Sequence, residues 1–168
     1  MDRLVMYPPA VTYQRQWDRL IGYALVHADS WHLLFNMITL WSFGTAAEQA
    51  FTSFSAKNGP TVFLAVYVSA VVVSILPSYF RHRRDATYVS LGASGGVSAV
   101  LAYAVMLEPA GTVLVFAIPM PGWLYLMLFV VVSAWLARRP QARINHQAHL
   151  VGTGYGLLLA LLLGSLSI

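Results

Sequence analysis

The stretch best suited to chemistry is Gly92-Ala93-Ser94-Gly95-Gly96, in which a serine hydroxyl stands at the start of an apolar run. A serine becomes an effective nucleophile only when a base takes its proton and donors receive the charge that develops on the attacked carbonyl. The flanking glycines remove side-chain bulk on either side of this hydroxyl. The rest of the chain therefore has to supply a base and a set of hydrogen-bond donors.

Three further polar residues lie in apolar stretches, where polar side chains are costly and are by default candidates for function. His32 and Asn36 are four residues apart, so on a helix both donate from the same face. His149 begins the last apolar stretch and is the candidate base. Structural alternatives remain open: the His32 and Asn36 pair could join helices by hydrogen bonds, and His149 could be an interfacial histidine that faces water.

The composition is that of a membrane protein. Of the 168 residues, 58% are hydrophobic and only 10% are charged, whereas charged residues make up about a quarter of a soluble domain. The chain has no cysteine, which excludes disulfides, thiol catalysis and cysteine metal sites. The net charge of +4 comes from arginines in short clusters, typical of loops that flank membrane spans, so nucleic-acid binding is not expected.

The apolar stretches predict an all-α fold, a polytopic membrane helix bundle of about five transmembrane helices in a single domain, residues 1–168. Residues 1–29 form a polar and aromatic arm suited to the water–lipid interface. Ser30 is the expected cap of the first span, and residues 111–121 are expected to be an apolar connection broken by prolines. The expected spans are roughly 30–50, 61–80, 94–107, 122–137 and 147–166.

The third span is short, because the fourteen steps from Ser94 to Glu108 rise only roughly 21 Å against a hydrocarbon thickness of about 30 Å. With Glu108 at one interface, Ser94 lies below the other. Non-helical backbone at that depth is tolerated only inside protein or beside a water-filled cavity, so we expect a wet pocket above Ser94. The parity of crossings also places His32 and His149 on the same side as Ser94.

Small residues predict a close contact between the third and fifth spans. The two expected faces are Ser94, Ser98 and Ala102 on the third span and Gly152, Gly156 and Ala160 on the fifth. Packing of these faces would bring Ser94 and His149 together.

These residues resemble the rhomboid intramembrane serine proteases. The resemblance extends from roughly Arg19 to the C-terminus and rests on three motifs, each at the head of an alternate span. The motifs are His27 with His32-Leu-Leu-Phe-Asn36, then Gly92-Ala93-Ser94-Gly95, and finally Ala148-His149-Leu150-Val151-Gly152.

The resemblance implies a rhomboid-like fold and an intramembrane serine endopeptidase that cleaves transmembrane segments of membrane proteins through a Ser–His dyad. Ser94 is the implied nucleophile, and His149 the general base and then acid. His32, Asn36 and the backbone N–H of Ser94 are the implied oxyanion donors. The implied partners are transmembrane protein substrates and the lipid bilayer, with no metal and no cofactor, and the implied location is a bacterial inner membrane.

Four glycines are expected to support this site by allowing close approach of the backbone. They are Gly92, Gly95, Gly152 and Gly156. No carboxylate falls beside His149, which argues against a full Ser–His–Asp triad.

The chain departs from the family pattern at several positions. No apolar span precedes Arg19, where the family core has a first helix, so we expect a reduced or N-terminally truncated member. The arm reads Trp17-Asp18-Arg19 where the family has tryptophan directly before the arginine. Ser98 stands where many members carry an aromatic that stacks on the catalytic histidine. Orientation stays open, because basic residues gather on the side of the site although typical bacterial members open outward.

Three other functions compete with this one. Gly92-x-Ser94-x-Gly96 matches the nucleophile elbow of α/β-hydrolases, but that fold needs a strand before the serine and an acid before the histidine. A catalytically silent rhomboid-like protein that binds transmembrane clients would fit the absent first helix, yet would not need the nucleophile, the base and both oxyanion side chains. A channel or transporter is disfavoured because two of the five spans lack polar pathway residues.

Overall fold

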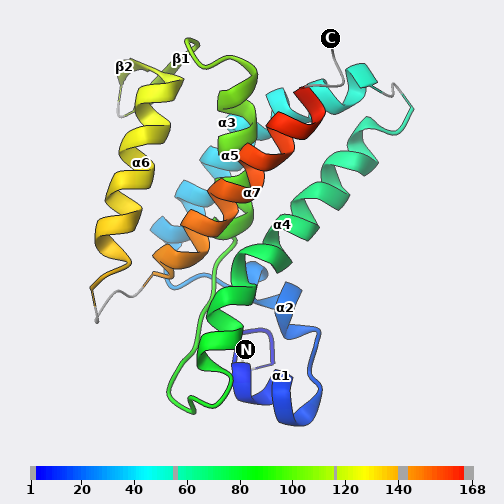
Figure 1. The fold of residues 1–168 in the computed structure, drawn as a ribbon, viewed down its shortest axis with the longest axis vertical. Helices are drawn as coiled ribbons and strands as arrows, with labels where there is room; N and C mark the ends of the chain where they lie inside the picture. The colour runs from blue at the N-terminus through cyan, green and yellow to red at the C-terminus, as the bar shows by residue number, and fades with distance from the viewer. Residues whose placement is uncertain (1–2, 55–56, 116, 140–143, 165–168) are drawn as a thin grey trace.

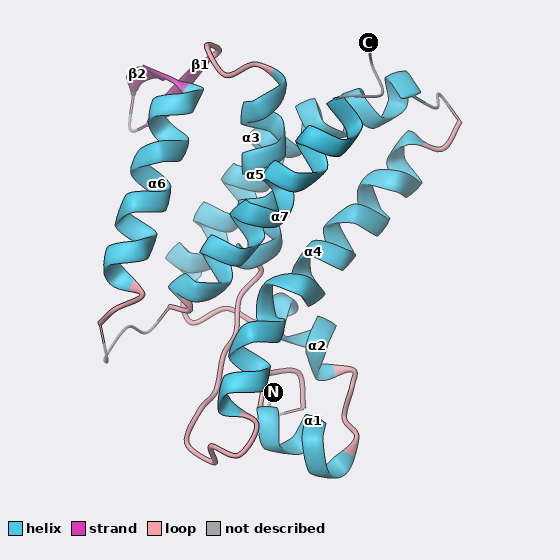
Figure 2. Cartoon of the chain, viewed as in Figure 1, coloured by secondary structure: helices cyan, strands magenta, loops and turns pink. Residues whose placement is uncertain are grey.

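The computed structural model describes residues 3–54, 57–115, 117–139 and 144–164, and most of them are helical (Figures 1 and 2). The predicted all-α bundle is confirmed for this part of the chain. The last two residues of the predicted fifth span lie outside it. The bundle helices are α3 (Ser30–Phe54), α4 (Gly59–His82), α5 (Ser94–Leu107), α6 (Gly122–Leu136) and α7 (His146–Gly164).

Helix α5 lies at the centre of the bundle, between α3 and α7 (Figure 1). It contacts the four other bundle helices and packs most extensively against α7. Every residue from Gly95 to Val105 is buried. A helix that is apolar all round is one that neighbours enclose on all sides, so the small and apolar sequence that follows Ser94 accounts for this central position.

One described helix, α4, is long and apolar enough to cross a membrane by its own length and composition, whereas α5 and α6 are shorter apolar helices. Helix α5 has 14 residues, fewer than the roughly 20 that a membrane span needs. Length and composition alone therefore support one membrane span in the described residues, and the expectation of five spans depends on the packing of α3 to α7 in one bundle.

A short hairpin forms the connection between α5 and α6, where the sequence predicted an apolar connection broken by prolines. Strand β1 (Thr112–Val115) pairs antiparallel with β2 (Ile118–Pro121), and Leu114 lies opposite Pro119. A two-stranded ribbon consists only of edge strands, the setting in which a strand tolerates proline. The hairpin lies at the end of the bundle away from the N-terminal arm (Figure 2).

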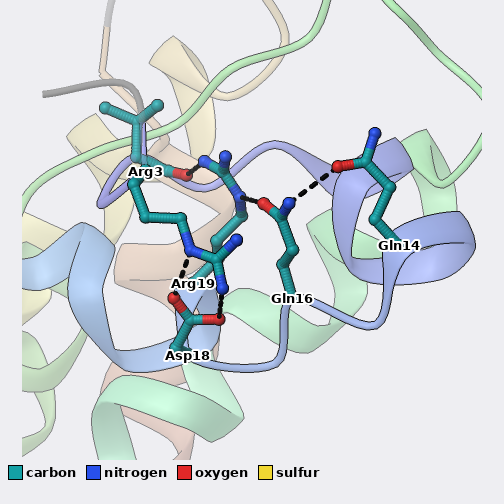
Figure 3. Close-up of polar contacts among 6 residues, drawn as sticks. Arg3, Gln14, Gln16, Asp18 and Arg19 are labelled. Atoms are coloured by element: carbon teal, nitrogen blue, oxygen red, sulfur yellow. Dashed lines mark hydrogen bonds and ion pairs between the residues drawn. The ribbon is translucent and has the colours of Figure 1, made fainter.

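The N-terminal arm is folded and consists of α1 (Pro8–Gln14), α2 (Arg19–Gly22) and the 3₁₀ helix η1 (Tyr23–Leu25). The guanidinium of Arg3 pairs with both carboxylate oxygens of Asp18, at 2.9 and 3.1 Å (Figure 3). This pair is exposed, and exposed pairs contribute little to stability. The buried Arg19 instead donates to the side chain of Gln16 and the carbonyl of Val5, both at 2.6 Å. These charge-assisted bonds hold the arm in one conformation.

Candidate active site

Ser94 is the first residue of α5, and the arm holds the loop that precedes it. Ser90 and Met6 exchange both of their backbone hydrogen bonds, at 2.9 and 3.0 Å. The Gly92 N–H donates to the carbonyl of Tyr23 at 2.9 Å, and the Tyr23 hydroxyl donates to a backbone carbonyl in α4 at 2.7 Å. Burial raises the pKa of Tyr23, so this hydroxyl stays a neutral donor. The arm thus fixes the path of the chain into Ser94.

Gly92 allows the loop to turn into α5 beside His32. Its φ is +107°, in a region that residues with a Cβ rarely adopt. A Cβ at Gly92 would also lie 2.5 Å from Cε1 of the His32 ring. Both observations require glycine at position 92. The close approach also places His32, a predicted oxyanion donor, beside the loop that precedes Ser94.

The predicted close contact between the helices that carry Ser94 and His149 is present. A Cβ added to Gly152 would overlap the carbonyl oxygen of Gly95, and one added to Gly156 would overlap that of Ala99. The facing residues of α5 are therefore Gly95 and Ala99. The prediction that residues 94, 98 and 102 form this face is wrong at Ser94 and Ser98, because these two line a cavity instead.

That cavity has a volume of about 450 Å³ and lies where the short third span predicted a pocket. Ser94, His149, His32 and Asn36 all line it, so three helices bring the four predicted catalytic and oxyanion residues to one space. The other lining residues are mainly apolar: Asp29, Trp31, Phe35, Thr39, Val97, Ser98, Leu101, Tyr125, Phe129 and Ile144.

The imidazole of His149 is held by packing. Its side chain is buried, stacks on Phe129 of α6 with centroids 5.6 Å apart and planes 23° apart, and meets the edge of His146 at 5.1 Å. Within the described ranges the ring makes no hydrogen bond, and Nε2 has no partner. Ser94 and His149 thus share the cavity without a hydrogen bond between them. Catalytic hydrogen bonds often tighten only when substrate is present.

The start of α3 orients the two oxyanion candidates. Asp29, not Ser30, caps this helix, because its Oδ1 accepts the His32 N–H at 2.8 Å. In the described part of the chain, both ring nitrogens of His32 lack a hydrogen-bond partner. Asn36 donates from Nδ2 to the His32 carbonyl at 2.8 Å, which leaves its second amide hydrogen for a ligand.

His27 connects the arm to both the loop and His32. Its Nε2 accepts the Ala93 N–H at 3.5 Å, and its ring meets that of His32 edge to face at 5.1 Å. Burial, and secondarily the nearby His32, lower the pKa of His27, which favours the neutral ring that this acceptor role needs. His27 therefore supports Ala93, the residue before Ser94.

Sequence reasoning missed three residues that position His149. Phe129 and His146 carried no sequence signal for contact with His149. Asn145 did, since an asparagine before a helix is a typical cap. Its Oδ1 accepts the Ala148 N–H at 3.1 Å. Its Nδ2 lies within hydrogen-bonding distance of three hydroxyls, those of Ser78, Tyr88 and Ser90, at 2.9, 3.0 and 3.3 Å.

Metal ligands do not gather in the described residues, which contain no group of three or more His, Cys, Asp or Glu side chains placed to hold an ion.

The fold and these motifs define a rhomboid protein, and the chain belongs to the rhomboid family, whose domain matches residues 14–166. It is 32% identical over 145 residues to mitochondrial Rhomboid protein 1 of Saccharomyces cerevisiae, covering 83% of this chain and 40% of the yeast protein. It is 29% identical over 147 residues to YdcA of Bacillus subtilis, covering 88% and 67%. With the rhomboid protease GluP of Bacillus subtilis it shares 33% over 84 residues, covering 50% and 14%.

Family membership makes the chain an integral membrane protein. The chain spans 40% of the length of the yeast relative. The prediction of a bacterial inner membrane is not supported, because the yeast relative is mitochondrial by name.

Proposed function

We propose that this protein is an intramembrane serine endopeptidase that cleaves transmembrane segments of other membrane proteins. The observation that carries the proposal is the single cavity lined by Ser94, His149, His32 and Asn36. Membership of the rhomboid family supports it. Helices α3 to α7 would all cross the bilayer in this proposal, with the mostly apolar cavity wall facing the substrate chain.

The proposal assigns one chemical role to each of these groups. Ser94 Oγ attacks the substrate carbonyl while His149 Nε2 takes its proton, and His149 then gives that proton to the leaving amine. The oxyanion receives hydrogen bonds from the imidazole of His32 and the free amide hydrogen of Asn36. The third donor is the N–H of Ser94, which has no partner within its helix as the first residue of α5. Water in the cavity then hydrolyses the acyl-enzyme.

The second candidate function is a catalytically silent rhomboid-like protein that binds transmembrane clients. The observation in its favour is that Nε2 of His149 makes no hydrogen bond to Ser94 or to any other described residue. The two functions share a fold and differ in whether Ser94 reacts.

Labelling of the detergent-solubilised protein by a fluorophosphonate serine probe separates these two functions. We expect the wild type to be labelled and Ser94→Ala and His149→Ala to lose labelling while they remain folded. Ser98→Ala is the matched control, because Ser98 also lines the cavity one turn further along α5, and it should keep labelling. A folded wild type that resists the probe would favour the silent client-binding protein.

A further inference from the structure

We infer that Phe129 of α6 is a positioning residue for His149, so that the orientation of the base depends on a second helix. This inference rests on the proposed function. It starts from what holds the two parts of His149. The backbone of α7 is fixed by its contact with α5 at Gly152 and Gly156. In the described part of the chain Nε2 of the imidazole has no hydrogen-bond partner, so the rings that pack against it restrict its rotation.

Two rings pack against this imidazole. His146 belongs to α7 and meets the ring at its edge, with planes 84° apart. Phe129 comes from α6 and covers a face of the ring, with centroids 5.6 Å and planes 23° apart. This is the offset-stacked geometry that aromatic pairs prefer, with centroids about 4.5–7 Å apart. Phe129 is therefore the contact that ties the His149 ring to a different helix.

The aromatic residue of α5, Tyr103, stacks on Phe51 of α3 and not on His149. Ser98 lines the cavity one turn after Ser94, but its hydroxyl is engaged, because it donates to the Ser94 carbonyl at 2.6 Å. The aromatic support of His149 therefore comes across the cavity, from Phe129.

Helix α6 forms one wall of the cavity through Tyr125 and Phe129. Tyr125 stacks on Phe43 of α3, with centroids 6.2 Å and planes 3° apart. Tyr125 and Phe129 lie four residues apart and both line the cavity, so one face of α6 touches α3 through the first ring and His149 through the second.

Substitutions at Phe129 test this role by two independent readouts. Phe129→Leu removes the ring and keeps an apolar side chain, whereas Phe129→Tyr keeps the ring. Trp123→Leu is the matched control, because it removes an exposed aromatic side chain of α6 that does not line the cavity. The readouts are the NMR shift of the His149 ring protons in histidine-labelled protein, assigned with His149→Gln, and the rate of fluorophosphonate labelling.

In the wild type and Phe129→Tyr we expect the His149 ring protons to be shifted upfield by the stacked ring. The shift should be lost in Phe129→Leu and kept in Trp123→Leu. The labelling rate should fall roughly three- to tenfold in Phe129→Leu only, in line with the energy of an aromatic pair.

An unchanged His149 shift in Phe129→Leu would overturn the inference whatever the activity, because the rings would not be stacked in solution. A lost shift with an unaltered labelling rate would also overturn it, since the contact would exist without positioning the base. A wild type that shows the shift but is never labelled would instead defeat the proposed function, and the positioning role with it.

Discussion

Helices α7 and α6 both reach the cavity, but they are attached to the bundle in opposite ways. Gly152 and Gly156 bring the backbone of α7 against that of α5 with no room for a side chain between them. Helix α6 instead meets its neighbours through side chains: Tyr125 stacks on Phe43 and Phe129 on His149, and Leu126 packs in a buried cluster with α5. Much of the rest of α6 is exposed, including Val131 and Trp135.

The two kinds of contact differ in rigidity: the backbone contact between α5 and α7 is fixed, whereas the ring contacts of α6 can break and form again. A backbone contact tolerates almost no adjustment, because packed interiors do not deform continuously. It suits the pair of helices that carry Ser94 and His149. Stacked rings can part and meet again at small cost, about 0.5–1.5 kcal/mol for a pair beyond the apolar area that it buries. In the proposed function, such contacts suit a helix that covers the cavity and would admit a substrate segment.

The largest expected effect comes from breaking the backbone contact. Gly152→Ala places a Cβ onto the carbonyl oxygen of Gly95, and neither helix can yield except by moving apart. We expect the free energy of unfolding to fall by about 1–3 kcal/mol, the usual cost of overpacking. Labelling of Ser94 should fall with it, because the two helices separate. Unfolding in detergent, followed by circular dichroism, measures the first effect.

Gly154→Ala is the matched control, since a Cβ at Gly154 would meet nothing within 4 Å. Alanine is a better helix former than glycine by about 1 kcal/mol, so stability should hold or rise. An equal loss of stability in Gly152→Ala and Gly154→Ala would mean that the close α5–α7 contact does not stabilise the protein.

A smaller effect is expected from the residue that places the start of α7. Asn145→Ala removes the cap from the Ala148 N–H and the donor that joins α7 to α4 and to the loop before Ser94. Loss of a cap costs about 0.5–2 kcal/mol. Asn145→Asp keeps an acceptor for the Ala148 N–H and places a negative charge at a helix N-terminus, where it is favourable.

We therefore expect the alanine variant to unfold more easily and the aspartate variant to stay close to the wild type in denaturant titrations. An aspartate variant as unstable as the alanine variant would show that the cap is not what places α7.

Much of the α5–α7 pair and of the cavity could be predicted from the sequence, because a tight helix contact needs small residues and a buried polar site needs polar residues in apolar stretches. The glycine cluster and Glu108-Pro109 indicated a helix from Ser94, and α5 runs from Ser94 to Leu107. Polar residues in apolar stretches indicated the site, and Ser94, His32, Asn36 and His149 do line one cavity. The small residues on α5 and α7 predicted a tight contact, which Gly152 makes.

The parts that could not be predicted depend on rotation and on tertiary neighbours. Residues 94 and 95 are both small, so composition could not decide which one faces α7. Helix α6 is apolar on all sides, and nothing in its sequence marks Phe129 as the residue that faces His149. Pro119 argued against a strand, yet a two-stranded hairpin tolerates it. Ser30 was expected to cap the first span, but it is the first helical residue, and Asp29 caps the helix.

The smallest expected effect concerns the link between the arm and the nucleophile loop. Burial lowers the pKa of His27 below its usual value of about 6.5. As the pH falls below about 6.5, His27 in the unfolded chain binds a proton before His27 in the folded chain does. The contribution of His27 to stability is therefore complete above about pH 6.5 and declines as the pH falls toward the lower pKa of the folded state. His27→Gln cannot titrate. The stability advantage of the wild type over His27→Gln should therefore shrink between pH 7.5 and 5 in matched unfolding titrations. An advantage that stays constant would show that neutral His27 does not support Ala93, and that the arm holds the loop through Met6 and Tyr23 alone.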